Sequence, residues 1–142
     1  MNFDYDQDIE KLCENNHFMN YNHMRMVECK DDTCIVELTV VHDSLNPYEI
    51  IHGGALYTMA DCACGIAARK DGRRYVTLSG QLNFLLSAKE GDTVRAIGHI
   101  RHRGRTTAFA EVDILNQDDR TVASGGFTFF CLNNQEKGKP TT

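Results

Sequence analysis

The chain has 142 residues, of which 42% are hydrophobic and 25% are charged, values ordinary for one globular domain with a sizeable core. The net charge of −5 argues against bulk binding of nucleic acid, which needs a basic surface. No apolar run is long enough to cross a membrane and the first residues do not form a signal peptide, so we expect a cytoplasmic location without a membrane partner.

The six cysteines predict neither a disulfide framework nor a metal site. They include no CxxC pair, and Cys62 and Cys64 lie two apart on a predicted helix, where they point in different directions. Without a secretory context we expect reduced thiols, most of them buried. Zinc is not expected, because His99 and His102 lie on a predicted strand and face opposite sides.

The first part of the chain is predicted to form short helices and then a hairpin. Residues 5–20 have helical spacing, which gives an N-terminal helical segment over 1–22. Residues 23–30 and 33–41 alternate as strands do and are separated by a short acidic turn, so the two strands should pair.

Residues 50–68 are expected to form the central element around which the rest of the fold is arranged. A helix of about four turns is predicted to begin at Gly54, and its apolar stripe consists of Leu56, Met59, Ala60, Ala63, Ile66 and Ala67. The other face is small and uncharged except for Asp61, so the helix should be buried. A carboxylate in such a helix is costly unless it is hydrogen-bonded or used in chemistry. The alternative is a solvated Asp on a partly exposed helix.

Gly53 and Gly54 stand at the start of this helix. Glycine lets a ligand approach the backbone, and the first N–H groups of a helix lack internal partners and carry partial positive charge. Such a helix start can hold a developing oxyanion, and a carboxylate two turns further along favours hydrolysis of an acyl compound. The alternative is an ordinary glycine-rich junction.

After the helix, hydrophobic residues recur at every second position. The predicted strands cover residues 75–86, 93–103, 106–116 and 120–132, the last interrupted at Gly125-Gly126. In the first of them one face is expected to carry Val76, Leu78, Leu82 and Phe84, and the other Thr77, Ser79, Gln81 and Asn83. A hairpin, a buried helix and a four-strand meander predict an α+β fold, in which one antiparallel sheet of five to six strands wraps around the helix. We expect a single domain over 1–142 that ends in a polar tail at 133–142.

The motif Asn46-Pro47-(x4)-His52-Gly53-Gly54-(x6)-Asp61, on this order of elements, resembles the hotdog-fold acyl-CoA thioesterases of the PaaI-like family. The resemblance covers about residues 23–132 and includes Gly104-Arg105-Thr106. It implies a hotdog fold and hydrolysis of an aryl- or medium-chain acyl-coenzyme A. The coenzyme A thioester is then the substrate, and neither a further cofactor nor a metal is required.

The resemblance also implies roles for single residues. The Gly53 N–H would hold the thioester carbonyl, while His52 and Asn46 would shape the loop and contact the thioester or the attacking water. Asp61 would be the nucleophile or the general base, and Thr77 would help to position water. The family's site is shared between subunits, so we expect a homo-oligomer, a dimer or a homotetramer built as a dimer of dimers.

Four residues are candidates to contact coenzyme A: Gly54, Arg103, Arg105 and Thr106. Arginine suits the geometry of phosphate groups, although the alternative for either Arg is a solvated turn or a pair with Glu111. The chain departs from the family at Glu49, where a Gly is common, and an acid there could weaken coenzyme A binding.

Other interpretations remain open. His52 could instead cap the helix, and Thr77 could be an ordinary strand residue. The whole chain could be a non-catalytic hotdog protein that binds acyl-CoA and acts as a regulatory subunit. A hotdog dehydratase or hydratase is favoured least, because the motif offers no second His to pair with Asp61.

Overall fold

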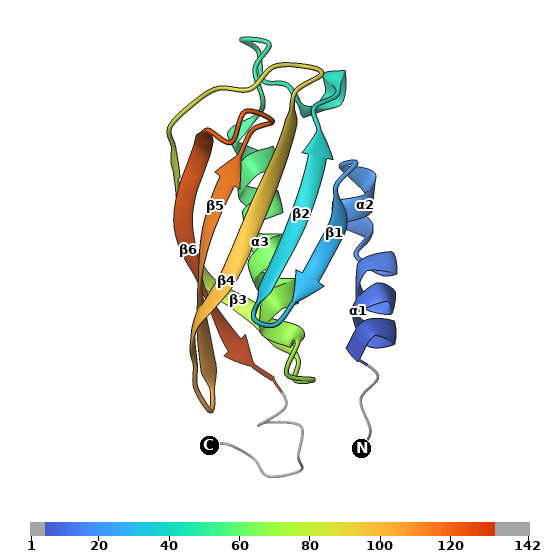
Figure 1. Ribbon diagram of the computed structural model, residues 1–142, viewed down its shortest axis with the longest axis vertical. Coiled ribbons are helices and arrows are strands. Elements are labelled where there is room, and N and C mark those ends of the chain that lie inside the picture. Colours follow the sequence, from blue (N-terminus) through green and yellow to red (C-terminus); the bar gives the residue numbers. More distant parts are fainter. Residues whose placement is uncertain (1–4, 133–142) are drawn as a thin grey trace.

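The computed structural model describes residues 5–132, and at its centre helix α3 (Gly53–Arg69) is enclosed by one antiparallel sheet (Figure 1). The six strands are β1 (Arg25–Lys30), β2 (Thr33–Thr39), β3 (Tyr75–Phe84), β4 (Thr93–Arg103), β5 (Thr107–Leu115) and β6 (Thr121–Cys131). The shorter helical elements are α1 (Tyr5–Glu14), α2 (His17–Tyr21) and the 3-10 turn η1 (His42–Ser44). The expected hotdog architecture is confirmed. The predicted polar tail lies outside the described residues.

The order of the strands across the sheet is β1-β2-β4-β5-β6-β3, which corrects the predicted four-strand meander. Strands β4, β5 and β6 do form a meander, but β3 lies at the far edge and pairs with β6. The chain crosses the sheet within α3, which packs on β2 and β4 as well as on β3. The alternation of hydrophobic residues identifies each strand but carries no information about which strands pair in the sheet. This crossing could therefore not be inferred from the sequence.

Small residues allow α3 to lie close to the sheet. Strands β2, β4 and β5 bury every second side chain, as their alternation predicts. At the centre of the contact, a Cβ atom on Gly98 would lie 2.8 Å from the backbone nitrogen of Cys64. The alanines around it are fully buried on both sides of the contact: Ala60, Ala63, Ala67, Ala96, Ala108 and Ala110. The helix backbone, rather than long side chains, therefore rests on the sheet.

Strand β3 contains a bulge that corrects its predicted faces. Its pairing with β6 shifts between Thr77 and Ser79, so Leu78 is an extra residue. Before the bulge Thr77 faces α3, and after it Gly80 and Phe84 do so. The predicted pattern had placed Thr77 on the opposite face from Phe84.

Strand β6 is not interrupted at its glycines. It runs through Gly125 and Gly126 while pairing with both β3 and β5. A Cβ atom at Gly125 would collide with the backbone oxygen of Gln81, and one at Gly126 would lie 2.7 Å from Cζ of Phe109. The two glycines therefore make room for neighbouring strands.

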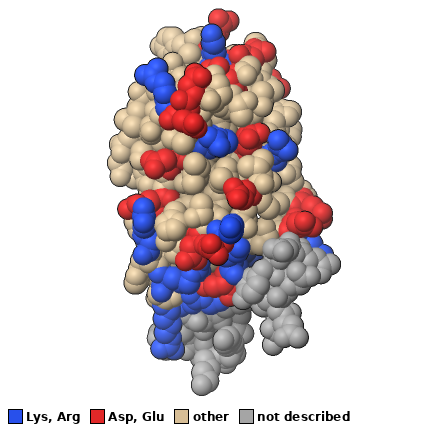
Figure 2. All heavy atoms as spheres, viewed as in Figure 1, with Lys and Arg blue, Asp and Glu red and all other residues tan. Residues whose placement is uncertain are grey.

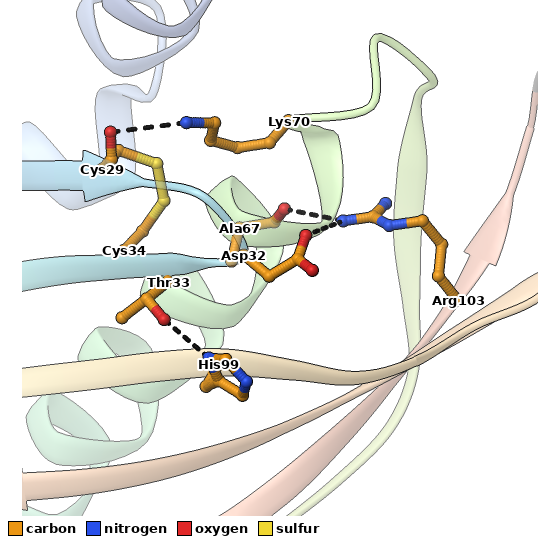
Figure 3. The surroundings of a disulfide bond; sticks show 8 residues. All are labelled: Cys29, Asp32, Thr33, Cys34, Ala67, Lys70, His99 and Arg103. Carbon is orange, nitrogen blue, oxygen red and sulfur yellow. Dashed lines mark hydrogen bonds and ion pairs between the residues drawn. A yellow bond between two sulfur atoms is a disulfide. The ribbon is translucent and has the colours of Figure 1, made fainter.

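The prediction that all cysteines are reduced is wrong for one pair. Cys29 and Cys34 form a disulfide across the β1–β2 hairpin, where they are register partners with Cα atoms 4.1 Å apart (Figure 3). The sequence shows only two cysteines five apart without a motif, and their proximity arises from the hairpin register. Beside the bridge, Nζ of Lys70 donates to the backbone oxygen of Cys29 (3.4 Å).

The outer face of the sheet carries acidic and basic side chains mixed together (Figure 2). Neighbouring strands contribute ion pairs such as Arg25–Glu37 (3.1 Å) and Arg101–Glu111 (2.7 Å). In the part of the chain that the structure describes, no helix has both the length and the apolar character to cross a membrane.

Candidate active site

The start of α3 is capped by His52. The His52 backbone is extended (φ −67°, ψ 136°), and its Nδ1 accepts a hydrogen bond from the Gly54 N–H (2.7 Å). Because Nδ1 is an acceptor, a neutral His52 carries its proton on Nε2. A Cβ atom on Gly54 would lie 2.9 Å from this Nδ1, so the second glycine makes room for the cap. The capping interpretation of His52 thus has direct geometric support, and its contact with a thioester stays a prediction.

The Gly53 N–H is the donor that the first turn leaves open. The Gly54 N–H is taken by His52, and the Ala55 and Leu56 N–H groups donate to the His52 carbonyl (3.0 and 3.3 Å). Within residues 5–132 the Gly53 N–H has no acceptor. It lies at the positive end of the helix dipole, where an oxyanion is stabilised. Gly53 keeps its predicted place, whereas the Gly54 donor is already used and its role in binding coenzyme A is not supported.

Asn46 organises the loop before the helix. Its Oδ1 accepts from the backbone N–H groups of Tyr48 (2.9 Å) and Ile50 (3.4 Å), and its own N–H donates to the Ile50 carbonyl (2.8 Å). This turn holds Glu49 in the left-handed region (φ 62°). The family's usual glycine would adopt that conformation without strain. Glu49 adopts the conformation that favours glycine, and its side chain places an exposed acid on the loop.

Asp61 and Thr77 form the other part of the site. The Thr77 hydroxyl donates to Oδ1 of Asp61 (2.7 Å), and the bulge in β3 is what turns Thr77 toward α3. Burial raises the pKa of the Asp61 carboxyl, and the hydrogen bond from Thr77 acts in the opposite direction. The two residues were predicted from a family motif, and the structure brings them together. A carboxylate with a raised pKa beside a hydroxyl can act as a base or as a nucleophile.

The predicted residues line three separate cavities within one chain, and one of them, of about 460 Å³, is lined by His52 and Gly54. Asn46 and Gly53 line a cavity of about 370 Å³ together with Phe84, whose ring covers Gly53. Asp61 and Thr77 line a cleft of about 300 Å³ on another part of the helix. Gly53 and Asp61 are eight residues apart, which is about 12 Å along a helix. One chain therefore does not assemble the whole predicted site.

Arg103 has a structural role that weakens its candidacy as a ligand of coenzyme A. Its Nη1 donates to the carbonyl of Ala68 (2.7 Å) and lies 2.7 Å from Oδ2 of Asp71. Its Nη2 donates to the carbonyl of Ala67 (3.3 Å) and to Oδ1 of Asp32 (3.2 Å; Figure 3). The guanidinium thus caps α3 and ties it to the β1–β2 turn.

Arg105 and Thr106 lie at the exposed tip between β4 and β5. The backbone of this tip is braced by Arg73, which donates to the carbonyls of Gly104 (2.9 Å) and Arg105 (2.8 Å). The proposed role of these two residues in binding phosphate is compatible with their exposure. Among residues 5–132, no group of three or more His, Cys, Asp or Glu side chains is arranged to hold a metal ion.

The sequence allowed N-terminal residues to form part of a pocket wall but did not indicate which of them border the Asp61 cleft. Leu12, Cys13 and Asn16 line the cleft, and Nδ2 of Asn16 donates to Sγ of Cys62 (3.7 Å). Helical spacing predicted α1 and α2 but carries no information about where they dock. Phe84, on the predicted inner face of its strand together with Leu82, lines the cavity that contains Gly53.

The similarity to known proteins agrees with this geometry. The model of the thioesterase superfamily matches residues 48–123, which is more than half of the chain and includes the end of the loop, α3 and Thr77. The chain belongs to the thioesterase superfamily. This membership makes it a thioester hydrolase.

Relatives within the family have known structures or names. The chain is 32% identical to the acyl-coenzyme A thioesterase PaaI of Escherichia coli over 98 residues, which are 69% of this chain and 70% of that protein. The structure of E. coli PaaI superimposes with a TM-score of 0.86 at 27% identity, covering 89% of this chain and 92% of that one. A hypothetical thioesterase of Streptococcus pneumoniae, solved with coenzyme A, gives a TM-score of 0.73 at 34% identity and covers 90% and 94%.

Replacing Thr77 by Val should raise the pKa of the Asp61 carboxyl further, because the hydroxyl that stabilises the charged form is lost while burial remains. Thr77→Ser, which keeps the hydroxyl, should leave this pKa near its wild-type value. Titration of the Asp61 carboxyl carbon by NMR measures both variants. An equal pKa in wild type and Thr77→Val would contradict the assigned hydrogen bond.

Proposed function

We propose that the protein hydrolyses the thioester of an aryl- or medium-chain acyl-coenzyme A, releasing the free acid and coenzyme A. The observation that carries this proposal is the Asp61 carboxylate, which is half-buried, is the one acidic group of α3, is hydrogen-bonded to Thr77 and is open to a cleft. Membership of the thioesterase superfamily and the coenzyme A in the S. pneumoniae relative support the choice of substrate.

The chemistry follows from the two parts of the site. The Gly53 N–H donates a hydrogen bond to the thioester oxygen and stabilises the negative charge that develops on it. Asp61 either takes a proton from water, which then attacks the carbonyl carbon, or attacks that carbon itself to form an anhydride that water opens. In both routes the C–S bond breaks and the coenzyme A sulfur leaves. Thr77 orients the carboxylate, and His52 and Asn46 hold the loop that presents Gly53.

We infer that the complete site forms between two subunits. Strand β3 is an edge of the sheet, and it exposes Val76 (46%) and Leu78 (58%). An open strand edge with apolar side chains is stabilised by pairing with a second copy about a two-fold axis. Such pairing would bring Asp61 and Thr77 of one chain to Gly53 of the other, which resolves their separation in a single chain. Further pairing of dimers into a homotetramer stays part of the proposal.

A dehydratase or hydratase mechanism has less support. Such an enzyme pairs a His with a carboxylate, but among the described residues no His lines the Asp61 cleft. A non-catalytic acyl-CoA-binding role does not account for the half-buried Asp61 carboxyl with its raised pKa. Measuring the activity of wild type and an Asp61 variant separates this role from catalysis.

Asp61→Asn should lower kcat by about 10²–10⁴ because the base or nucleophile is lost while size and shape are kept. The variant should be at least as stable as wild type at pH 7, since a raised pKa means that folding favours the protonated carboxyl and that the charged form is a cost at neutral pH. Asp118→Asn, on an exposed turn, is the matched control and should keep full activity. Near-full kcat in Asp61→Asn would contradict both catalytic roles of Asp61, whereas the absence of turnover in wild type would favour the binding role.

The same reaction in ¹⁸O-water separates the two roles of Asp61. Under single turnover, label in the Asp61 carboxyl indicates a nucleophile whose anhydride is opened at the side chain. Label confined to the released acid fits a general base or an anhydride opened at the acyl carbon.

Mixing two inactive variants tests the shared site. Gly53→Pro removes the open N–H, and Pro is tolerated at the first position of a helix after an extended residue such as His52. Loss of an oxyanion donor costs about 10²–10³ in kcat. Co-refolding Gly53→Pro with Asp61→Asn should restore about a quarter of the wild-type activity, because half of the dimers are mixed and each mixed dimer holds one intact site. An inactive mixture, or a single-chain mass by light scattering, would contradict the shared site.

Arg105→Ala should raise KM for acyl-CoA by about tenfold or more with little change in kcat, since a charge-assisted contact with phosphate is worth about 1.5–3 kcal/mol. Arg103→Ala should instead lower the free energy of unfolding by about 1.5–3 kcal/mol, because it removes the capping hydrogen bonds of α3. Steady-state kinetics and urea unfolding of both variants test this division of roles. An unchanged KM in Arg105→Ala would overturn the assignment of Arg105.

A further inference from the structure

The hydrogen bond between Thr77 and Asp61 depends on how strand β3 is held against helix α3, because each element carries one of the two residues. Within one chain β3 is hydrogen-bonded to β6 alone, since it lies at the edge of the sheet. Thr77 is the last residue of β3 that pairs before the bulge at Leu78. Thr77 is therefore held by β6 and by the residues that precede it, and not by the pairing beyond the bulge.

Two residues before Thr77, the side chain of Tyr75 joins β3 to the end of α3. Its ring is buried, and its hydroxyl donates a hydrogen bond to Oδ2 of Asp71 (2.6 Å), in the turn between the helix and the strand. Arg73 of the same turn donates to Oδ2 through Nε (2.8 Å) and to Oδ1 through its backbone N–H (2.9 Å). The start of β3 is thus tied to the turn by a side chain as well as by the backbone.

Arg103, the last residue of β4, connects this turn to the last residues of α3. Its Nη1 lies 2.7 Å from Oδ2 of Asp71 and donates to the Tyr75 hydroxyl (3.4 Å). The same guanidinium donates to the carbonyls of Ala67 and Ala68, and Figure 3 shows the first of these contacts. Asp71, Tyr75 and Arg103 therefore form one network, which fixes the first residue of β3 relative to the end of the helix.

The charges of this network do not change at neutral pH. Burial acts to raise the pKa of the Asp71 carboxyl, but the hydrogen bonds from Tyr75 and Arg73, together with nearby positive charge, hold it below its ordinary value. Burial and the hydrogen bond to Asp71 raise the pKa of Tyr75 to about 12. Asp71 is therefore ionised and Tyr75 protonated over the range in which Asp61 titrates.

The other titratable groups that face Asp61 from the described walls of its cleft keep their charge in the same range. Burial raises the pKa of the Cys13 thiol on α1, and burial with the charge of Asp61 raises that of Cys62 to about 12. Arg69 of α3 stays protonated, as arginine does in proteins. A change in the pKa of Asp61 between variants therefore reports a change in its hydrogen bonding.

We propose that Tyr75 is a positioning residue, which keeps Thr77 within hydrogen-bonding distance of Asp61. Its own place is fixed by its contacts with Asp71 and Arg103. The inference rests on the proposed thioesterase activity, in which Asp61 is the reacting group. Because Tyr75 acts through Thr77, removing its hydroxyl should matter only while Thr77 can still donate to Asp61.

Tyr75→Phe keeps the buried ring and removes the hydroxyl. The pKa of the Asp61 carboxyl, followed by NMR at its carboxyl carbon, should rise, because a weaker bond from Thr77 stabilises the charged form less. The acidic limb of the pH profile of kcat should move to higher pH, since Asp61 acts in its charged form. At optimal pH, kcat should fall by about threefold to 10²-fold with little change in KM for acyl-CoA.

A double-mutant cycle with Thr77→Val separates positioning from a general loss of packing. Adding Tyr75→Phe to Thr77→Val should leave kcat and the pKa of Asp61 where Thr77→Val alone puts them. Thr33→Val is the matched control, because it removes another partly buried side-chain hydrogen bond, between Thr33 and Nδ1 of His99 (2.6 Å), on β2 and β4. It should lower the urea midpoint and leave the pKa of Asp61 unchanged.

Arg103→Lys reaches the same network from its other side. Lysine keeps a positive charge beside Asp71 but lacks the planar fork that joins the helix end to Tyr75. The pKa of Asp61 should again rise, and again without further change when Thr77→Val is present. This variant carries the test if Tyr75→Phe does not fold.

The outcomes distinguish this inference from the proposed function. If wild type hydrolyses no acyl-CoA, the proposed function fails, and the NMR titration still decides whether Tyr75 positions Thr77. An unchanged pKa of Asp61 in folded Tyr75→Phe overturns the inference. An equal rise with Thr77 and with Thr77→Val, or an equal rise in Thr33→Val, also overturns it. In an active enzyme, a raised pKa with unchanged kcat would reject a role of Tyr75 in the reaction.

Discussion

The close contact between the α3 backbone and the sheet is the constraint on which the rest of the structure depends. It requires small residues on both sides, and Gly98 beneath Cys64 marks the tightest point. A helix that is held this closely cannot rotate without a clash, so the direction of every side chain on its other face is fixed. Asp61 and the open N–H of Gly53 therefore have set positions before any ligand binds.

The sequence predicted the elements well and their arrangement only in part. Alternation identified β2, β4 and β5 with the correct inward faces, because each has one buried and one exposed side. It missed the bulge at Leu78, since one extra residue reverses the faces of a strand without any change in composition. It also could not place β3 beside β6 or join Cys29 to Cys34, because both depend on contacts between strands.

The residues of the candidate site were likewise predictable only in part. The helix start and the lone carboxylate could be identified from residue types and spacing, since helix ends and buried charges have general physical properties. The meeting of Asp61 with Thr77 was available only from the resemblance to a family. The sequence allowed an N-terminal pocket wall but did not identify Leu12 and Asn16, because docking of a short amphipathic helix is decided by shape across the fold. Arg103 shows the converse, since a residue type suited to phosphate serves here to cap a helix.

The unpaired donor at Gly53 has a consequence for the molecule without its substrate. In the first turn of α3, the N–H groups of Gly54, Ala55 and Leu56 donate to the side chain or carbonyl of His52, while the Gly53 N–H has no acceptor among the described residues. A ligand oxygen that accepts a hydrogen bond from the Gly53 N–H would complete the hydrogen bonding of that turn. The binding free energy of the ligand would then stabilise the folded state. If the thioester carbonyl binds at Gly53 as proposed, substrate binding and the stability of this turn are thermodynamically linked.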